Sequence, residues 1–300
     1  MNKMLIAGAN GFIARHLTDH FSKLGWEVAG LARRRDGLHE NCRYIEWDGK
    51  NLGEWSAEVD NCDVLVNMVG RSINCRHNEE NKKQILNSRV DSTKLLGQAL
   101  SQSENPPQAW INGSASGIYQ ETFDQAHGED GQHGEGFIAD VVKAWEDTFF
   151  SAEIPKSVRR VAMRTTMVIA DEPGNPFRIL RTLAKFGLGG KAGSGKQMVS
   201  WIHIEDLCRA VQLIIDQQQI EGSVNLAAPD AVNNAEMMRR FRKSVGMPIG
   251  IPAPAFGVRI GAYFMGTAPE LILDSCWVEP KLLVEHGFVF NHAEMKPKEW

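Results

Sequence analysis

The sequence predicts an α/β protein with a doubly wound parallel sheet and a smaller, mostly helical C-terminal lobe. Two observations support this prediction. The apolar run Leu5–Ala7 turns through Gly8 and Gly11 directly into an amphipathic helix pattern. Further along, short apolar runs alternate with helical periodicity through about six units, as expected for a parallel sheet covered by helices. In such Rossmann-type folds, ligands bind at the carboxyl ends of the strands.

The glycine turn after the first strand is the candidate phosphate-binding element. Gly8, Gly11 and Ala14 follow one another at three-residue spacing, and the small Ala14 lets the helix pack closely on the strand. Such a turn directs backbone N–H groups and the positive end of the helix dipole at one point, where a pyrophosphate fits. An ordinary βα turn is the alternative. The expected dinucleotide contacts here are Gly8, Asn10, Gly11, Phe12 and Ile13.

The end of the second predicted strand, Glu27–Ala32, indicates which dinucleotide binds. This tip lies beside the adenosine ribose, where an acid accepts the 2′-hydroxyl of NAD and arginine pairs with the 2′-phosphate of NADP. Arg33 and Arg34 follow the strand, so the sequence favours NADP(H). Asp36 is close enough to leave NAD open, and a solvated basic turn is the remaining interpretation.

Two further strand ends supply expected cofactor contacts. The strand predicted over 43–47 ends at Asp48, whose carboxylate is expected to reach the adenine amino group. The strand predicted over 63–69 ends with Val69 and stops at Gly70, where the lack of a side chain lets the backbone approach a cofactor closely.

Arg89 lies on a helix predicted over 78–100 that flanks the cofactor cleft, where it pairs with a phosphate or forms a surface salt bridge. The later predicted elements are a strand over 109–112, a polar loop over 120–136, helices over 137–150, 177–186 and 205–216, and strands over 157–163, 200–204 and 223–226. We expect a dinucleotide-binding domain over 1–170, completed by about 198–230, and a substrate lobe over 171–197 and 231–300.

Composition and charge exclude several classes of protein. The net charge of -4 gives no sign of nucleic-acid or anionic-membrane binding, and no apolar run approaches the ~20 residues of a membrane span. The five cysteines show no CxxC spacing, so we expect free thiols in the cytoplasm and no metal site. Gly190–Lys196 has the spacing of a P-loop, but Gln197 stands where Ser or Thr would hold Mg²⁺, which argues against a nucleotide hydrolase.

In combination, these motifs resemble the extended short-chain dehydrogenases/reductases, and more narrowly an atypical epimerase-like family related to sugar-nucleotide epimerases. The resemblance covers essentially the whole chain and implies a Rossmann domain with a small, family-specific C-terminal domain. The motifs that carry it are Gly8-x-x-Gly11-x-x-Ala14, Val66–Gly70, Ser88–Val90, Ser114–Tyr119, Ala144–Glu146, Gly193–Gln197, Trp201–Asp206, Asn225–Pro229, Glu279–Leu283 and Gly287–Phe290.

The sequence lacks the catalytic pair of that superfamily. The pattern is Tyr-x-x-x-Lys on the helix after the fifth strand, where the tyrosine transfers a proton and the lysine lowers its pKa. The chain has three tyrosines, Tyr44, Tyr119 and Tyr263, and none has a lysine four residues on. The helix expected to carry the pair, 137–143, is apolar where the tyrosine belongs.

Other residues near the strand ends are candidates to replace this pair. The candidate catalytic residues are Ser114, Ser116, Tyr119 and Glu129, and the candidate substrate contacts are Arg164, Trp201 and His203. We expect an NADP-dependent oxidoreductase or epimerase acting on a small molecule, such as a nucleotide sugar or carbonyl compound, as a monomer or homodimer. The alternative is a non-catalytic NADP(H)-binding protein with a redox-sensing or regulatory role.

Overall fold

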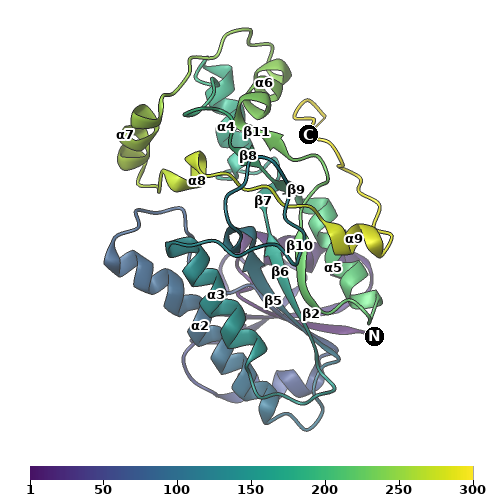
Figure 1. The fold of residues 1–300 in the computed structure, drawn as a ribbon. Coiled ribbons are helices and arrows are strands. Elements are labelled where there is room, and N and C mark those ends of the chain that lie inside the picture. Colours follow the sequence, from purple (N-terminus) through teal and green to yellow (C-terminus); the bar gives the residue numbers. More distant parts are fainter. Residues whose placement is uncertain (300) are drawn as a thin grey trace.

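A seven-stranded parallel sheet forms the centre of the molecule (Figure 1). The computed structural model describes residues 1–299. The strand order is β10-β6-β5-β4-β1-β2-β3. The strands are β1 (Lys3–Ala7), β2 (Glu27–Ala32), β3 (Cys42–Glu46), β4 (Val64–Asn67), β5 (Ala109–Ala115), β6 (Arg159–Thr165) and β10 (Gly222–Leu226). The predicted doubly wound sheet is therefore confirmed.

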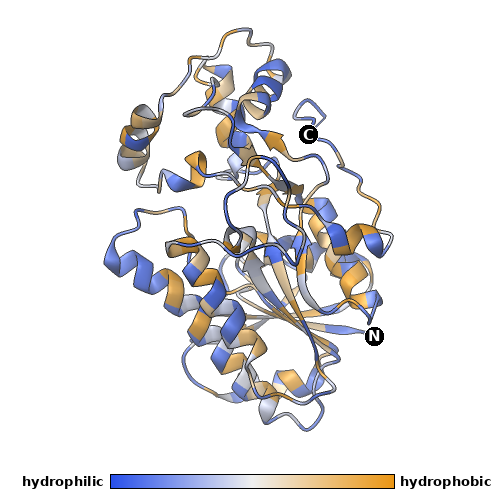
Figure 2. Cartoon of the chain, in the orientation of Figure 1, coloured by the Kyte–Doolittle hydropathy of each residue, from blue (hydrophilic) through white to orange (hydrophobic). Residues whose placement is uncertain are grey.

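Helices cover both faces of this sheet because its strands are apolar on both sides. Met4 and Ile6 of β1 face a core shared with α1 (Phe12–Lys23) and α5 (Ile204–Asp216). Leu5 and Ala7 point to the opposite face, where the core includes residues of α2 (Glu79–Ser101) and α3 (Phe137–Phe150). Figure 2 shows the apolar strands between helices whose outer faces are hydrophilic. This alternation follows from the two-residue period of a strand.

Most of the predicted elements lie within two residues of their observed bounds. The predicted strand over 27–32 and the predicted helix over 137–150 match the structure at both ends. β2 reaches β3 through the loop 33–41, and no helix was predicted between these two strands. The 3-10 segment η1 (Glu54–Asn61) before β4 was not predicted.

A second, smaller core lies in the upper part of the molecule (Figure 1). It includes residues from the neighbouring helices α4 (Pro176–Lys185) and α6 (Asn234–Ser244) and from two small sheets. Those sheets pair β7 (Met167–Ile169) with β9 (Trp201–His203), and β8 (Met198–Val199) with β11 (Val232–Asn233). The remaining helices are α7 (Ala255–Met265), α8 (Glu270–Leu273) and α9 (Lys281–Glu285).

The C-terminal segment crosses the carboxyl edge of the sheet on its way to α9. Cys276 forms a bridge with Val199 in β8, and Val278 forms one with His127 in the polar loop after β5. This segment therefore brings side chains from the end of the chain to the strand ends where ligands bind in such folds. No helix within residues 1–299 is long and apolar enough to cross a bilayer. All five cysteines are free thiols.

Candidate functional site

The glycine turn between β1 and α1 leaves no room for a side chain. Gly8 has φ +79°, and a Cβ added there would lie 3.0 Å from the backbone of Met68 and Val69. The Gly8 N–H donates to the Leu31 carbonyl (3.0 Å), and the Gly11 N–H donates to the Gly8 carbonyl (2.9 Å). Gly11 is the N-cap of α1 and has no side-chain oxygen, so the helix begins without a side-chain cap. The backbone N–H groups at the N-terminal end of α1 are thus available to bind an anion.

Asn10 fixes the basic loop after β2 against this turn. Its Nδ2 donates to the carbonyl of Arg34 (3.1 Å) and to the carbonyl of Asp36. The side chains of Arg33 and Arg34 are exposed and form no ion pair with any residue in 1–299. The loop therefore places two unpaired positive charges close to the turn. Asp48, by contrast, accepts hydrogen bonds from the backbone N–H groups of its own turn, which lower its pKa.

Gly70 and Arg89 meet at the end of β4. A Cβ on Gly70 would lie 3.1 Å from the Arg89 guanidinium carbon, so a larger residue would displace the arginine. The guanidinium lies over the Trp145 ring at 5.1 Å and donates to the carbonyls of Arg71 and Ile85. Burial lowers the pKa of Arg89 to about 10. Arg89 therefore remains a cation at neutral pH, beside the backbone that follows Val69.

A buried ion pair lies at the end of β6. Arg164 and Glu146 are 4% and 6% exposed. The guanidinium contacts both carboxylate oxygens, with Nε–Oε1 at 2.9 Å and Nη2–Oε2 at 2.8 Å. Burial lowers the pKa of Arg164, but the hydrogen bonds and charge of Glu146 outweigh it and hold that pKa above its usual value. The geometry is the bidentate arrangement that makes such pairs strong.

Two candidate catalytic residues belong to the same network. Ser114 donates from Oγ to Glu146, and Tyr119 accepts from Arg164 Nη1 at 2.8 Å. The Tyr119 hydroxyl in turn donates to Asn225 Oδ1 at 2.8 Å, and its ring stacks on His127. Burial raises the pKa of Tyr119, so its phenol stays protonated at neutral pH. These contacts give both hydroxyls a partner inside the protein.

The other two candidates, Glu129 and Ser116, contact the C-terminal segment. Glu129 accepts from the backbone N–H groups of Asn225 (3.1 Å) and Leu282 (3.3 Å), and burial raises its pKa. The Ser116 Oγ lies 3.2 Å from the Cys276 Sγ, which donates to it. Burial raises the pKa of Cys276, so this group is a neutral thiol. Ser116 lies at the start of the 3-10 turn η2 (Ser116–Ile118), directly after β5.

Two of the three predicted substrate contacts are enclosed by protein. Arg164 is held in its ion pair, and Trp201 is fully buried, with its indole Nε1 donating to the Asp230 carbonyl. Neither side chain presents a free surface to a ligand in this structure. His203 is the N-cap of α5, where its Nδ1 accepts from the Glu205 N–H. Burial, with the neighbouring His292, lowers the pKa of His203 to about 4.

Sequence reasoning missed several partners of the candidate residues. Glu146, Asn225 and Cys276 complete the polar network, yet none of them was a predicted site residue. Glu146 and Asn225 belong to motifs that carried the family resemblance, which was the available signal. Cys276 had no signal, because it is separated from Ser116 by 160 residues.

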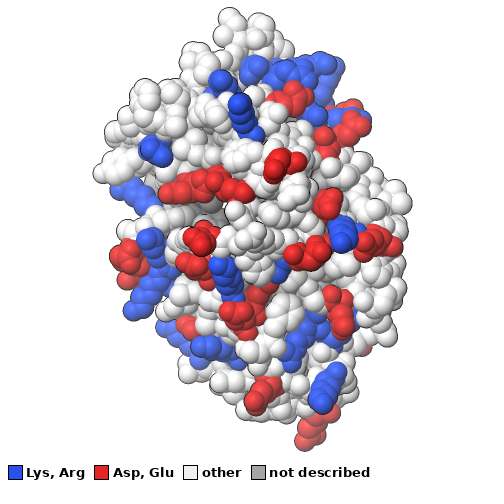
Figure 3. Space-filling view, viewed as in Figure 1, with Lys and Arg blue, Asp and Glu red and all other residues white. Residues whose placement is uncertain are grey.

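Asp274, at the end of α8, is another acid that the sequence did not single out. Burial and the neighbouring carboxylates of Glu121 and Glu270 raise its pKa from 3.8 to about 6. Figure 3 shows acidic side chains gathered over α8 on this face. The folded protein therefore binds the Asp274 proton more tightly than the unfolded chain does.

Asp274→Asn is expected to stabilise the protein at pH 7.5 and to have little effect at pH 4. With a raised pKa, the stabilising contribution of protonated Asp274 is present below pH 4 and is lost as the pH rises through about 6. The upper limit is about 3 kcal/mol at about 1.4 kcal/mol per pH unit. Because the side chain is more than a third exposed, we expect about 1 kcal/mol. Urea unfolding at both pH values measures this, and an equal effect at both would contradict it.

Two sequence profiles match the chain. The NAD dependent epimerase/dehydratase family matches residues 4–135, and a domain of unknown function (DUF1731) matches residues 253–297. Epimerase family protein SH2119 of Staphylococcus haemolyticus is 30% identical over 298 residues, covering 99% of this chain and 97% of that protein. Epimerase family protein SDR39U1 of Mus musculus is 31% identical over 300 residues, covering 98% of this chain and 97% of that protein.

Solved structures of epimerase-named proteins are also similar to this chain. The crystal structure of human epimerase family protein SDR39U1 (isoform 2) with NADPH has a TM-score of 0.86 at 30% identity, covering 99% of this chain and 98% of that chain. The nucleoside-diphosphate sugar epimerase from Corynebacterium glutamicum has a TM-score of 0.78 at 28% identity. That match spans 99% of this chain and 57% of the longer epimerase chain.

The parallel sheet, its glycine turn and the C-terminal lobe define a Rossmann-type protein of the short-chain dehydrogenase/reductase class. The chain belongs to the epimerase family of proteins within that class, and it carries the family's C-terminal domain. The predicted resemblance is confirmed.

Proposed function

We propose that the protein binds NADP(H) at the carboxyl edge of the sheet and catalyses hydride transfer on a small carbonyl compound or nucleotide sugar. The observation that carries this proposal is the glycine turn at Gly8, closed against the Met68–Val69 backbone, with unpaired Arg33 and Arg34 beside it. The human relative crystallised with NADPH supports the choice of cofactor.

Each part of the proposed site has a defined binding role. The backbone N–H groups at the start of α1 hold the pyrophosphate, and Arg33 and Arg34 hold the 2′-phosphate of the adenosine ribose. Asp48, Val69, Gly70 and Arg89 remain proposed contacts further along the strand ends. When bound, NADP(H) donates or accepts the hydride. We assign cofactor binding to residues 1–170, completed by about 198–230, and substrate binding to 171–197 and 231–300.

Ser116 is the proposed group for the substrate oxygen. Its hydroxyl lies at the end of β5, accepts from the Cys276 thiol at 3.2 Å and donates to the Thr165 carbonyl at 3.4 Å. That last hydrogen bond is long and therefore weak, so a substrate carbonyl oxygen can replace it. The other candidates are less suited to this role. Ser114 and Tyr119 direct their protons at internal partners, and Glu129 is bonded to two backbone N–H groups. Ser116 therefore polarises the carbonyl during hydride transfer.

A second candidate function is NADP(H) binding without catalysis. The observation that favours it is that all four candidate catalytic side chains form internal hydrogen bonds, while Tyr-x-x-x-Lys is absent. The deciding experiment first titrates the protein with NADPH. It then measures NADPH oxidation against aldehydes, ketones and nucleotide sugars. Turnover supports the enzyme, whereas tight NADPH binding with no turnover on any member of the panel favours the non-catalytic protein.

Arg33→Ala/Arg34→Ala is expected to weaken NADPH binding by about 100- to 10,000-fold and to leave NADH binding unchanged. Each lost charge-assisted hydrogen bond to the 2′-phosphate costs about 1.5–3 kcal/mol, and NADH lacks that phosphate. Fluorescence titration with both dinucleotides measures the ratio. Arg35→Ala is the matched control, because Arg35 is exposed in the same loop and is not a proposed contact. Tighter binding of NADH than NADPH by the unaltered protein would refute the cofactor assignment.

A further inference from the structure

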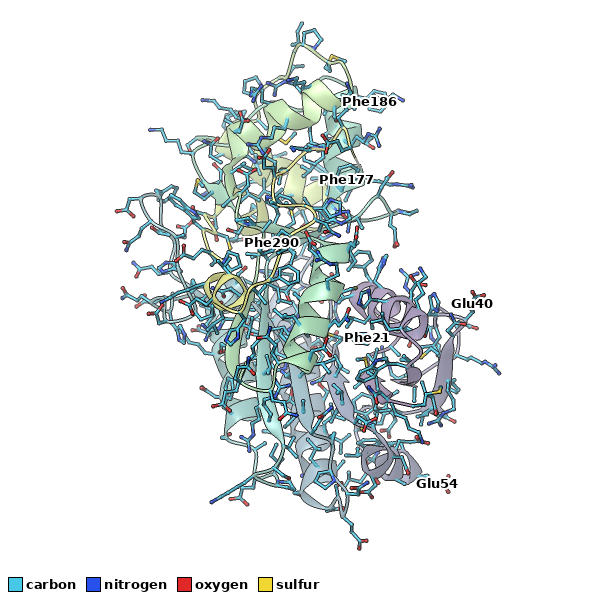
Figure 4. All side chains as sticks on the ribbon, turned by 90° about the vertical axis from the view of Figure 1, so that its right-hand side faces the viewer. Phe21, Glu40, Glu54, Phe177, Phe186 and Phe290 are labelled. Carbon is cyan, nitrogen blue, oxygen red and sulfur yellow. The ribbon has the colours of Figure 1, made fainter. Side chains whose placement is uncertain are left out.

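Three side chains with metal-binding atoms converge where the C-terminal tail meets the start of α5. His203 is the N-cap of α5, Glu205 lies in the first turn of that helix, and His292 belongs to the tail. One ligand atom from each of these three residues lies within 4.8 Å of the others. Figure 4 shows this side of the molecule, with the tail running from α9 past the labelled Phe290 alongside α5.

The distances between these groups approach those of a metal centre. The centroids of the His203 and His292 rings are 3.7 Å apart, and His292 Nε2 lies 2.9 Å from Glu205 Oε2. Around Zn²⁺, with bonds of about 2.0–2.2 Å to nitrogen and oxygen, neighbouring ligand atoms are about 3.4 Å apart in a tetrahedral arrangement. Side-chain rotations that move these atoms by about 1 Å would bring all three to such positions, because Glu205 is exposed and His292 is only partly buried.

A surrounding layer of hydrogen bonds holds the tail in register with the helix. Asp206 is fully buried, and its carboxylate accepts from the backbone N–H groups of Asn291 (3.0 Å) and His292 (2.7 Å). Arg209 pairs with the same carboxylate at 2.7 Å. Asn291 Nδ2 donates to Glu205 Oε1 at 2.8 Å, which orients the second oxygen of Glu205 toward His292. Outer hydrogen bonds of this kind position the ligands of metal sites.

We propose that His203, Glu205 and His292 bind a divalent transition-metal ion such as Zn²⁺, which joins the C-terminal tail to the start of α5. Two imidazoles and one carboxylate suit Zn²⁺ and its neighbours, whereas Mg²⁺ and Ca²⁺ prefer oxygen ligands. Three protein ligands leave a coordination position for water. This inference goes beyond the proposed function, since the ion fixes the tail whether or not the protein is an enzyme.

The structural alternative is a hydrogen bond between His292 and Glu205 with no metal. Both arrangements hold the tail against α5, but only the metal site requires His203, Glu205 and His292 together. They also differ in their response to a chelator, because removing an ion loosens the tail while a hydrogen bond is unaffected.

The experiment uses the full chain, first treated with a chelator and then dialysed. Calorimetric titration with ZnCl₂ is expected to show one ion per chain, and Co²⁺ is expected to give a visible absorption band. Zn²⁺ should also slow proteolysis of the tail. Glu205→Gln and His292→Ala should each weaken Zn²⁺ binding by more than the roughly 10- to 100-fold cost of losing an outer hydrogen bond.

His20→Ala is the matched control, because His20 is a partly buried histidine of α1 whose partner is Gln212. It should bind Zn²⁺ as the unaltered protein does. If the unaltered chain binds no Zn²⁺, or if His292→Ala binds it equally well, the metal site is refuted. The two variants change the tail and the exposed first turn of α5, and circular dichroism checks that each remains folded.

Discussion

Gly8→Ala is expected to weaken NADPH binding by about 10- to 100-fold. The added methyl would occupy a left-handed backbone conformation and would lie 3.0 Å from the backbone of Met68 and Val69, so the turn must move. That movement takes the N–H groups of the turn away from the pyrophosphate, and the loss of one charge-assisted hydrogen bond costs about 1.5–3 kcal/mol. Fluorescence titration with NADPH measures the change in affinity.

Gly25→Ala separates this effect from backbone strain. Gly25 has φ +81°, close to that of Gly8, but a Cβ there would have no neighbour within 4 Å. Both variants should lose about 1–2 kcal/mol of stability from the left-handed conformation. Only Gly8→Ala should lose NADPH affinity. Equal affinity in the two variants would mean that the turn does not hold the cofactor.

Arg164→Ala is expected to lower the free energy of unfolding by about 3–5 kcal/mol. The variant leaves the Glu146 carboxylate, which is 6% exposed, without its cationic partner, and an uncompensated buried charge has a cost of this size. It also removes the donors to Tyr119 and to the Glu129 carbonyl. Urea unfolding followed by both fluorescence and circular dichroism gives the free energy and tests two-state behaviour.

Arg178→Ala is the control for the Arg164 variant. Arg178 on α4 pairs with Asp171 at 2.6 Å, but both side chains are more than 40% exposed. Such surface pairs contribute about 0–1 kcal/mol, so this variant should be nearly as stable as the unaltered protein. A loss below 1 kcal/mol in Arg164→Ala would show that the buried pair contributes little to stability.

The sheet and its helices were predictable because their signals are local. Apolar runs of four to six residues, such as those of β1, β2 and β4, are typical of strands buried on both faces. The helix from Phe12 to Lys23 was indicated by its apolar periodicity directly after the glycine turn. The short strands β7 and β8 were missed because two or three residues carry no period.

The proposed cofactor contacts could be named from the sequence, since these residues follow strand ends. The hydrogen-bond network around Arg164 could not be inferred from the sequence. Its carboxylate partner lies 18 residues away on α3, and Asn225 lies 106 residues from the tyrosine it contacts. Spacing within the sequence does not reveal such pairs. Arg164 and Trp201 were predicted at the substrate cleft because they follow or form strands there, but packing encloses both of them.

The sequence by itself determined the doubly wound sheet, the glycine turn, the basic residues after β2 and the absence of Tyr-x-x-x-Lys. These depend on turn chemistry and periodicity over a few residues. The tertiary structure decided which polar groups are held internally and which remain available. It placed Cys276 against Ser116 and joined Glu205 to His292, 87 residues further on. Contacts between distant residues form only when the chain packs, so they leave no periodic trace in the sequence.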